Sequence, residues 1–309
     1  MKKNLLIAAL IVGIAGLAVG QKNEISNVEI VTADIDNFWK AYDAAKPEFN
    51  PDVFQKLYLD VGTPGLKSFV KSRIKSAENI AKVIRKRPIY YASLRQSTGM
   101  IRSMEPEIKD SFRKMKLLYP KMQSPKVYFV IGVMNSGGTG FHDGLIIGTE
   151  MYGRTKETSE EELSDWLKTV LKPVNEIPHI VAHELVHNFQ DYDGGSLLAA
   201  CIKEGGADYI AELISGSHIN QYVHDFAEPK EKELWLEFKE RMLQDDYDGW
   251  LYSATKGRPN DLGYWMGYKI TKAYFDTMTD KTAAMEHYLN IKDFEKFLEE
   301  SGYPKKFKD

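Results

Sequence analysis

The stretch Val181-Ala182-His183-Glu184-Leu185-Val186-His187 carries the strongest chemical pattern in the sequence. We expect it to be helical, so that residues four apart lie one above the other on the same face. His183 and His187 then offer two imidazole nitrogens to one metal ion, and Glu184 lies beside the first histidine. Two such ligands with an adjacent carboxylate are typical of a zinc site in which the carboxylate is the general base.

A catalytic zinc ion takes a third protein ligand and keeps one open position. His179 lies one turn before His183, but it is eight residues from His187, or ~12 Å along a helix axis, so one ion cannot bind both. Asp193 lies six residues after His187, where metzincin peptidases have their last histidine. It stays an alternative third ligand.

Glu204 is the third ligand that we expect, because it follows a glycine turn that allows the next helix to fold back on the first. Asp208 lies four residues further on the same face and is expected to accept a hydrogen bond from a ligand histidine. Gly205 and Gly206 cost ~1 kcal/mol each against alanine within a helix, which suggests a close approach of two helices around the metal. A solvated face is the alternative, but the apolar neighbours, such as Ile210, favour burial.

The order His183-Glu184-x-x-His187, then Glu204-Gly205-x-Ala207-Asp208-Tyr209, resembles the active site of the gluzincin metallopeptidases, which include thermolysin and a group of zinc aminopeptidases. This resemblance implies a Zn²⁺ cofactor and a zincin-like fold. The whole mature chain is also similar to a set of exported bacterial proteins described as predicted zinc-dependent proteases. That set is linked to a gliding-motility lipoprotein.

The same resemblance implies a catalytic tyrosine. The aminopeptidases carry a Tyr-x-x-Gly segment downstream of the third ligand, and its tyrosine stabilises the oxyanion. Tyr264-Trp265-Met266-Gly267 matches this segment, and Tyr268 is the reserve candidate one turn further on. The alternative is that Tyr264 belongs to the core, since aromatic residues are dense here.

Hydrophobic periodicity predicts an α+β protein that is mostly helical, with a zincin-like catalytic core, a small mixed sheet and surrounding helices. Residues 27–119 read as helices. Two strands are expected at 127–133 and 144–151, with a glycine-rich loop at 135–140 between them. In a zincin the edge strand receives an extended peptide by strand addition. Further helices are expected at 159–171 (with Ser159 as N-cap), from Pro178 to about 192, at 197–214, 231–243, 264–278, 282–289 and 294–300.

Residues 1–20 read as a signal peptide, with Lys2 and Lys3 ahead of an apolar run and small residues before a mature start at Gln21. An uncleaved membrane anchor is the alternative, although the run is short for a membrane span. A lipid anchor needs a cysteine where Gln21 stands. Since Cys201 is the one cysteine, an internal disulfide is excluded, and its apolar surroundings predict a buried, inert thiol.

After the signal peptide we expect an N-terminal helical region at 21–125 and a zincin-like catalytic region at 126–309. The 309 residues are 43% hydrophobic and 28% charged, with a net charge of −3, as in ordinary globular proteins. The charges form no long run of one sign, so nucleic acid is not an expected partner. The oligomeric state stays open.

These features together predict a periplasmic or extracellular zinc metallopeptidase without a stable membrane span after signal cleavage. Its substrate is a peptide or protein, Glu184 is the general base and Tyr264 stabilises the oxyanion. Endo- or exopeptidase specificity stays open. The alternative is a non-catalytic binding or assembly protein of the cell envelope that retains a zincin fold. The presence of Glu184 favours catalysis, because a structural metal site needs no base.

Overall fold

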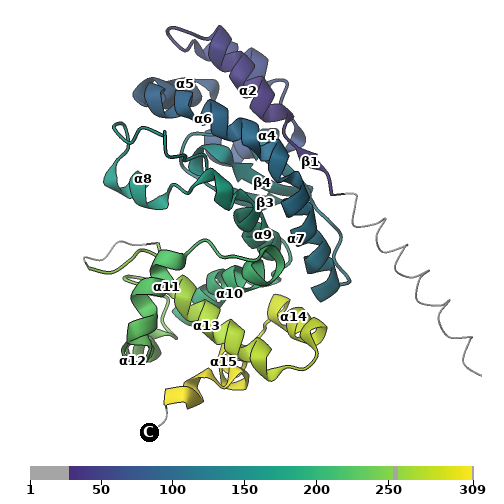
Figure 1. Cartoon of the computed structure of the whole chain (residues 1–309), viewed down its shortest axis with the longest axis vertical. Helices are drawn as coiled ribbons and strands as arrows, with labels where there is room; N and C mark the ends of the chain where they lie inside the picture. The colour runs from purple at the N-terminus through teal and green to yellow at the C-terminus, as the bar shows by residue number, and fades with distance from the viewer. Residues whose placement is uncertain (1–27, 253–256, 308–309) are drawn as a thin grey trace, which may run out of the picture.

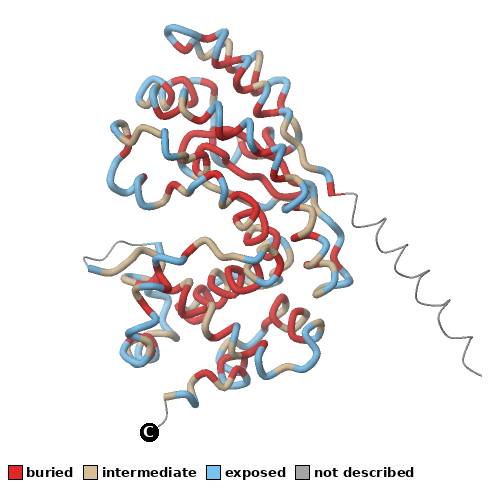
Figure 2. The backbone as a smooth tube through the Cα atoms, viewed as in Figure 1, coloured by how far each residue is buried: buried red, intermediate tan, exposed pale blue. Residues whose placement is uncertain are grey.

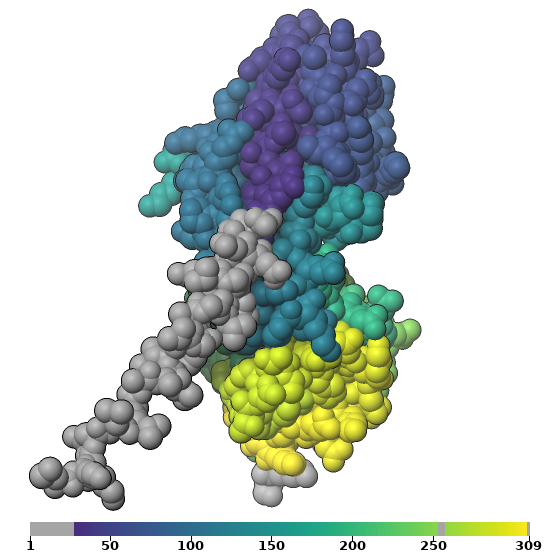
Figure 3. Space-filling view, turned by 90° about the vertical axis from the view of Figure 1, so that its right-hand side faces the viewer, coloured from purple at the N-terminus to yellow at the C-terminus, as the bar shows by residue number. Residues whose placement is uncertain are grey.

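The computed structural model describes residues 28–252 and 257–307, which are mostly helical with one small mixed sheet (Figure 1). This confirms the expected α+β class. The predicted signal peptide at 1–20 and the mature start at Gln21 lie outside the described residues. The N-terminal helices occupy one end of the molecule and the C-terminal helices the other, as the space-filling view also shows (Figure 3).

The sheet has the strand order β1-β2-β4-β3. Its strands are β1 (Ile30–Val31), β2 (Lys126–Val130), β3 (Gly138–Phe141) and β4 (Gly144–Gly148). β2 pairs in parallel with β1 and β4, and β3 pairs antiparallel with β4, with Gly138 opposite Ile147. β3 is therefore an edge strand. Every residue of β4 is buried, as its continuous apolar run predicts.

The N-terminal region is a series of short helices, some of which pack against this sheet. They are α2 (Ala33–Ala44), α3 (Pro51–Phe54), α4 (Pro64–Phe69), α5 (Ala77–Lys86), α6 (Pro88–Met100) and α7 (Glu105–Leu118), with the π-helical turns η1 (Gln55–Leu59) and η2 (Val70–Ile74) and the 3₁₀ turn η3 (Ile101–Met104). α2 and α4 contact β2. A Cβ added to Gly65 of α4 would lie 2.4 Å from the ring of Tyr128, so this helix packs directly on the strand.

The helix with the histidine motif is α9 (Ile177–His187), which lies between the sheet and the C-terminal helices (Figure 1). It contacts β3 and β4 on one side and α10 (Leu197–Ser215) on the other. The side chain of Ser196 caps α10 by accepting a hydrogen bond from the Ala199 amide, and Gly216 ends it with a φ of 90°. Both ends agree with the prediction to within a residue.

The remaining helices form the C-terminal end of the molecule. They are α11 (Gln221–Ala227), α12 (Glu231–Arg241), α13 (Leu262–Thr277), α14 (Lys281–Leu289) and α15 (Phe294–Ser301), followed by the turn η7 (Tyr303–Phe307). α10 and α13 pack closely along their lengths. Buried segments concentrate in the sheet, α9, α10 and α13 (Figure 2), and the connected group of buried apolar side chains extends from Val28 to Tyr303. Among the described residues, no helix is both long and apolar enough to span a membrane.

Two predicted helix boundaries are wrong. α8 (Asp165–Val170) begins at the N-cap Ser164 and not at Ser159. The carboxylate of Glu162, three residues after Ser159, accepts hydrogen bonds from the amides of Ile89 and Tyr90 and so does not cap a helix at Ser159. α9 ends at His187 and not near 192, because the chain turns away to pair the Asp191 amide with the Leu289 carbonyl at 2.8 Å.

The strand predictions need four corrections. The strand expected at 144–151 ends at Gly148, and Thr149–Met151 form a 3₁₀ turn. Residues 135–140 were expected to be a loop, but Gly138–Phe141 pair with β4 as β3. β1 lies in a region that was expected to be helical, because two residues are too few for a visible alternation. β2 ends at Val130, since the next amide, that of Ile131, bonds to the Tyr58 hydroxyl at 3.0 Å and not to a strand.

Candidate metal centre

Two adjacent helices bring together three of the predicted site residues. His183 and His187 lie one turn apart on α9, and Glu204 faces them from α10. The two Nε2 atoms are 2.9 Å apart, and Glu204 Oε2 lies 3.6 Å from His183 Nε2 and 3.3 Å from His187 Nε2. Ligands ~2.1 Å from a tetrahedral zinc ion lie about 3.4 Å from one another, so the three atoms have the spacing of such a site.

The tautomers of both histidines follow from their other ring nitrogens. His183 Nδ1 lies 2.8 Å from Asp208 Oδ1, and His187 Nδ1 lies 2.6 Å from Gln190 Oε1. Gln190 Nε2 donates to the Lys203 carbonyl, which fixes Oε1 as the acceptor. Both histidines therefore carry their proton on Nδ1 when neutral, and both Nε2 atoms present a lone pair to the same point.

The electrostatics of the cluster favour a cation. Burial opposes ionisation of Glu204, but the neighbouring His187 and His183 hold the pKa of its carboxyl well below the usual range. Burial also opposes protonation of His183, yet Asp208 and Glu204 outweigh it and raise the pKa of His183 to about 10. Three converging lone pairs thus attract either a proton or a metal ion, and Zn²⁺ suits two imidazoles and a carboxylate.

A further layer of residues positions the ligands. Asn220 Nδ2 donates to Asp208 Oδ2 at 2.6 Å, and the Tyr252 hydroxyl donates to Glu204 Oε1 at 3.1 Å. Asp208 and Asn220 are buried. Of these positioning residues the sequence predicted only Asp208. Gln190, Asn220 and Tyr252 were missed, because no fixed spacing connects them with the histidine motif.

A small pocket of about 150 Å³ opens beside His183, and Glu184 and Tyr264 both line it. Glu184 also faces the edge strand, since a Cβ added to Gly138 would lie 2.6 Å from the Glu184 side chain. Lys172 lines the pocket as well, where burial lowers its pKa and its Nζ donates to the Ile219 carbonyl at 2.9 Å. The metal cluster therefore has an accessible side that holds both a carboxylate and an ammonium group.

Tyr264 lies on α13 and stacks on His183, with ring centroids 6.0 Å apart and an angle of 19° between the planes. Within the described part of the chain, nothing hydrogen-bonds its hydroxyl. The reserve candidate Tyr268 instead donates to Glu212 Oε2 at 2.5 Å and packs against His224. It is thus committed to a different contact.

The other sequence candidates lie outside the cluster. The Asp193 side chain is fully exposed, with an oxygen 3.8 Å from Lys203 Nζ. His179 Nδ1 bonds to the Ser215 hydroxyl at 2.9 Å. Cys201 is buried, as predicted, and burial raises the pKa of its thiol. Of the three candidates for the third ligand, the structure thus places Glu204 beside the histidines.

The helix glycines pack differently from the prediction. A Cβ on Gly205 would lie 2.0 Å from the Tyr264 carbonyl oxygen, and one on Gly206 would meet the Tyr288 ring at 2.5 Å. These glycines allow α10 to approach α13 and α14. The expected close helix approach is present at both glycines, but the segments that approach α10 there are those of Tyr264 and Tyr288.

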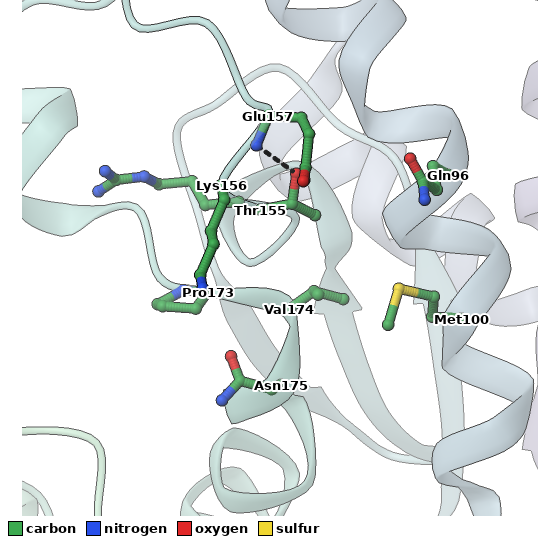
Figure 4. Close-up of a pocket in the computed structure, with 9 residues that line it drawn as sticks. Gln96, Met100, Thr155, Lys156, Glu157, Pro173, Val174 and Asn175 are labelled. Carbon is green, nitrogen blue, oxygen red and sulfur yellow. Dashed lines mark hydrogen bonds between the residues drawn. The ribbon is translucent and has the colours of Figure 1, made fainter.

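A larger cavity of about 680 Å³ lies between α6 and the turn around Val174 (Figure 4). Its lining includes Met100, Lys156 and Glu157, whose amide donates to the Thr155 hydroxyl. None of the metal-centre residues lines it. The cavity size alone therefore does not identify the site with the metal-binding geometry.

Comparisons with known proteins identify one family. The family model described as "Gliding motility protein GldB" matches residues 20–305. The chain matches no curated protein and no solved structure. The match covers nearly the whole described chain, including both helices of the metal cluster. It agrees with the expectation of an exported protein.

This match corrects the functional prediction. The expected zinc metallopeptidase of the gluzincin type was wrong, since the matching family is a gliding-motility family and not a peptidase family. The non-catalytic alternative agrees better with it. The physical reason for the error is that His183, His187 and a downstream glutamate specify how a metal is held, and the same ligands serve a site without catalysis. Over residues 20–305, the chain belongs to the GldB family of gliding motility proteins.

Proposed function

We propose that this chain is a non-catalytic binding or assembly protein of the cell envelope that acts in gliding motility. The observation that carries this proposal is the family match over residues 20–305. We place the protein on the periplasmic or extracellular side, in agreement with the predicted signal peptide. The 126–309 region acts as a zincin-like scaffold in this proposal, with α9 beside an edge strand as its core.

The proposed cofactor is one Zn²⁺ held by His183, His187 and Glu204. The tetrahedral spacing of the three ligand atoms and the fixed tautomers support it. A bound metal ion links α9 to α10 and removes the repulsion between two facing lone pairs. Because an unfolded chain does not hold the ligands together, metal binding stabilises the folded state. The metal thus serves the scaffold.

The partner in this proposal is a protein segment that binds along β3. The strand is an edge strand, and edge strands accept an extended segment through main-chain hydrogen bonds. Gly138 of β3 lies against Glu184, and the pocket beside the metal cluster carries Lys172. The segment is held by main-chain hydrogen bonds, and in this proposal Glu184 packs against Gly138 and transfers no proton.

A pair of substitutions tests the proposal. Cells that carry Glu184→Gln in place of the wild type are expected to glide at nearly wild-type speed, because the change keeps the shape of the side chain and removes only its charge. His183→Ala is expected to abolish both zinc binding and gliding. Gliding speed and the zinc content of the purified variants are the two measurements.

The opposite outcome is equally clear. Loss of gliding in Glu184→Gln, with zinc content and melting temperature unchanged, contradicts a non-catalytic role. Normal gliding in His183→Ala contradicts the metal-dependent scaffold. Exposed His142, on the turn between β3 and β4, supplies the matched control as His142→Ala, since its side chain is 84% exposed and lies outside the cluster.

A further inference from the structure

A third cavity, in the N-terminal region, is lined by several positive charges. It has a volume of about 420 Å³ and is lined by Lys67, Lys71 and Lys75, with Leu59 and Val70 as its apolar lining. We call it the lysine pocket. The three lysines come from α4 and from η2 and its end, and they share no residue with the metal centre.

The protein neutralises the positive charge of the lysine pocket only in part, since the Lys67 ammonium lies close enough to the buried Asp34 carboxyl to counter the rise in its pKa. All three lysines are exposed, and none has a carboxylate oxygen within 4.0 Å among the described residues. Lys75 Nζ donates instead to the Lys71 carbonyl at 2.8 Å. By contrast, Lys109 of α7 is paired with Glu105 at 2.6 Å. Like charges four residues apart destabilise a helix, so a bound anion relieves this repulsion.

The backbone around the pocket is unusual in two independent ways. Two π-helical turns border it, with Gln55 and Leu59 from η1 and Val70 and Lys71 from η2. Such turns are rare and are frequent at functional sites. Lys75 also has a φ of 72°, a left-handed conformation that a residue with a Cβ adopts at a cost. Strain of this kind is often retained where it shapes a binding site.

We propose that the lysine pocket binds a phosphate group. A phosphate carries more charge than a carboxylate and has enough oxygen atoms to accept hydrogen bonds from three ammonium groups at once. Ser76 and Gln55 lie at the same pocket, but the Ser76 side chain caps α5 and hydrogen-bonds Glu78, so the three lysines are the groups available to the phosphate. The Gln55 amide already donates to Asp60 at 2.6 Å, which keeps that acid bound at the rim.

The phosphate can belong to a soluble phosphate ester or to a phospholipid headgroup, and the experiment separates the two. Purified full-length mature protein is titrated with inorganic phosphate and glycerol phosphate in a calorimeter. In parallel it is sedimented with vesicles of phosphatidylglycerol or of phosphatidylcholine. Binding of the soluble anions alone identifies a soluble ligand. Binding to phosphatidylglycerol vesicles above phosphatidylcholine identifies a headgroup.

The decisive variant is Lys67→Gln combined with Lys71→Gln. Its matched control is Lys40→Gln combined with Lys168→Gln, two exposed lysines outside the pocket. The pocket variant is expected to lose about thirty-fold in affinity, or ~2 kcal/mol for two lysines, while the control changes less than two-fold. Unchanged melting temperatures establish that both variants fold.

Three results overturn the proposal. The first is that wild type binds neither the soluble anions nor phosphatidylglycerol vesicles. The second is an equal loss of affinity in the pocket variant and the control variant, which indicates an unspecific charge effect. The third is wild-type affinity in the pocket variant. None of these results depends on zinc, so the proposals for the metal centre and for the lysine pocket are tested independently.

Discussion

The metal centre and the lysine pocket are built in opposite ways. At the metal centre each ligand atom is oriented by a further residue, and His183 is only 5% exposed. At the lysine pocket the three lysines are exposed, and the hydrogen bond from Lys75 Nζ to the Lys71 carbonyl is a contact within the cluster itself. A metal ion requires positions fixed to a few tenths of an ångström, whereas point charges on flexible stems suffice for a phosphate. The comparison suggests a rule: side chains held in fixed positions favour a metal ion, whereas mobile charged side chains favour a larger anion such as phosphate.

Removal of the metal is expected to have the largest effect. Purified wild type is expected to contain about one zinc ion per chain, and His183→Ala less than a tenth of that, because two remaining ligands hold zinc weakly. A chelator is expected to lower the melting temperature of wild type. The loss is ~4 kcal/mol if zinc was present at a thousandfold excess over its Kd. Elemental mass spectrometry and thermal unfolding measure the two effects.

The lysine pocket is expected not to respond to removal of the metal. A chelator is expected to leave phosphate binding at the lysine pocket within two-fold of the untreated protein, as long as the chain stays folded. The absence of zinc from wild type purified without chelators contradicts the proposed metal centre. An unchanged melting temperature after zinc is removed contradicts the scaffold role of the metal, although the ligands themselves are then established.

The sequence predicted the convergence of His183, His187 and Glu204 better than the family to which the chain belongs. His183 and His187 follow from helix spacing, and Glu204 follows from its place after the glycine turn, so local geometry suffices for these three. Asn220 and Gln190 depend on how distant segments fold together, and no local pattern reveals them. Function was misjudged because the three residues of the cluster indicate only how a metal ion can be held, while hydrolysis depends on the whole surface around it.

The second-largest expected effect concerns a buried acid in neither site. Burial raises the pKa of Glu150 to about 7 from an ordinary 4.5, against the opposing effect of the Gly132 and Met134 amides that donate to it. The folded protein therefore keeps the proton that the unfolded chain loses. Its contribution to stability is fully present below pH 4.5 and is lost as the pH rises through 7, by ~3 kcal/mol in total.

Chemical denaturation of wild type and Glu150→Gln between pH 5 and 8 measures this effect. The difference in unfolding free energy between the two proteins is expected to change by ~3 kcal/mol across the range, which cancels contributions from other groups. The exposed Glu157 supplies the control as Glu157→Gln. A constant difference between wild type and Glu150→Gln contradicts the raised pKa. This prediction bears on the comparison of the two sites, since Glu150 is a buried ionisable group that lies in neither of them.

The third prediction tests whether the positioning residues matter. Asp208→Asn keeps an oxygen near His183 Nδ1 but removes the charge that strengthens this hydrogen bond. Zinc affinity is expected to fall 10- to 100-fold, as for other outer-shell carboxylates. Competition with a chromogenic chelator measures it. The control is Asp276→Asn, an exposed acid paired with Lys272. Equal affinities in the two variants contradict the claim that ordered ligands distinguish the metal centre from the lysine pocket.

The fold was predictable where neighbouring residues all favour the same secondary structure. α10 follows from its Ser196 cap, its apolar run and Gly216, and each of these acts within a few residues. β3 was missed, because two of its four residues are glycines with little strand propensity. Its pairing with the buried β4 stabilises it, and Gly138 is needed there because a side chain would collide with Glu184. Tertiary packing thus overrides local preference beside the site.

The smallest expected effect lies in the lysine pocket. Lys75→Gly relieves the left-handed conformation at a φ of 72° and is expected to stabilise the protein by about 0.5 kcal/mol, while phosphate affinity falls several-fold. The control Lys71→Gly lies within a helical turn, where glycine costs ~1 kcal/mol. Urea denaturation and calorimetry measure both quantities. Equal destabilisation in the two variants contradicts stored strain at Lys75. A gain in stability with a loss of binding indicates that this strain is retained for the ligand.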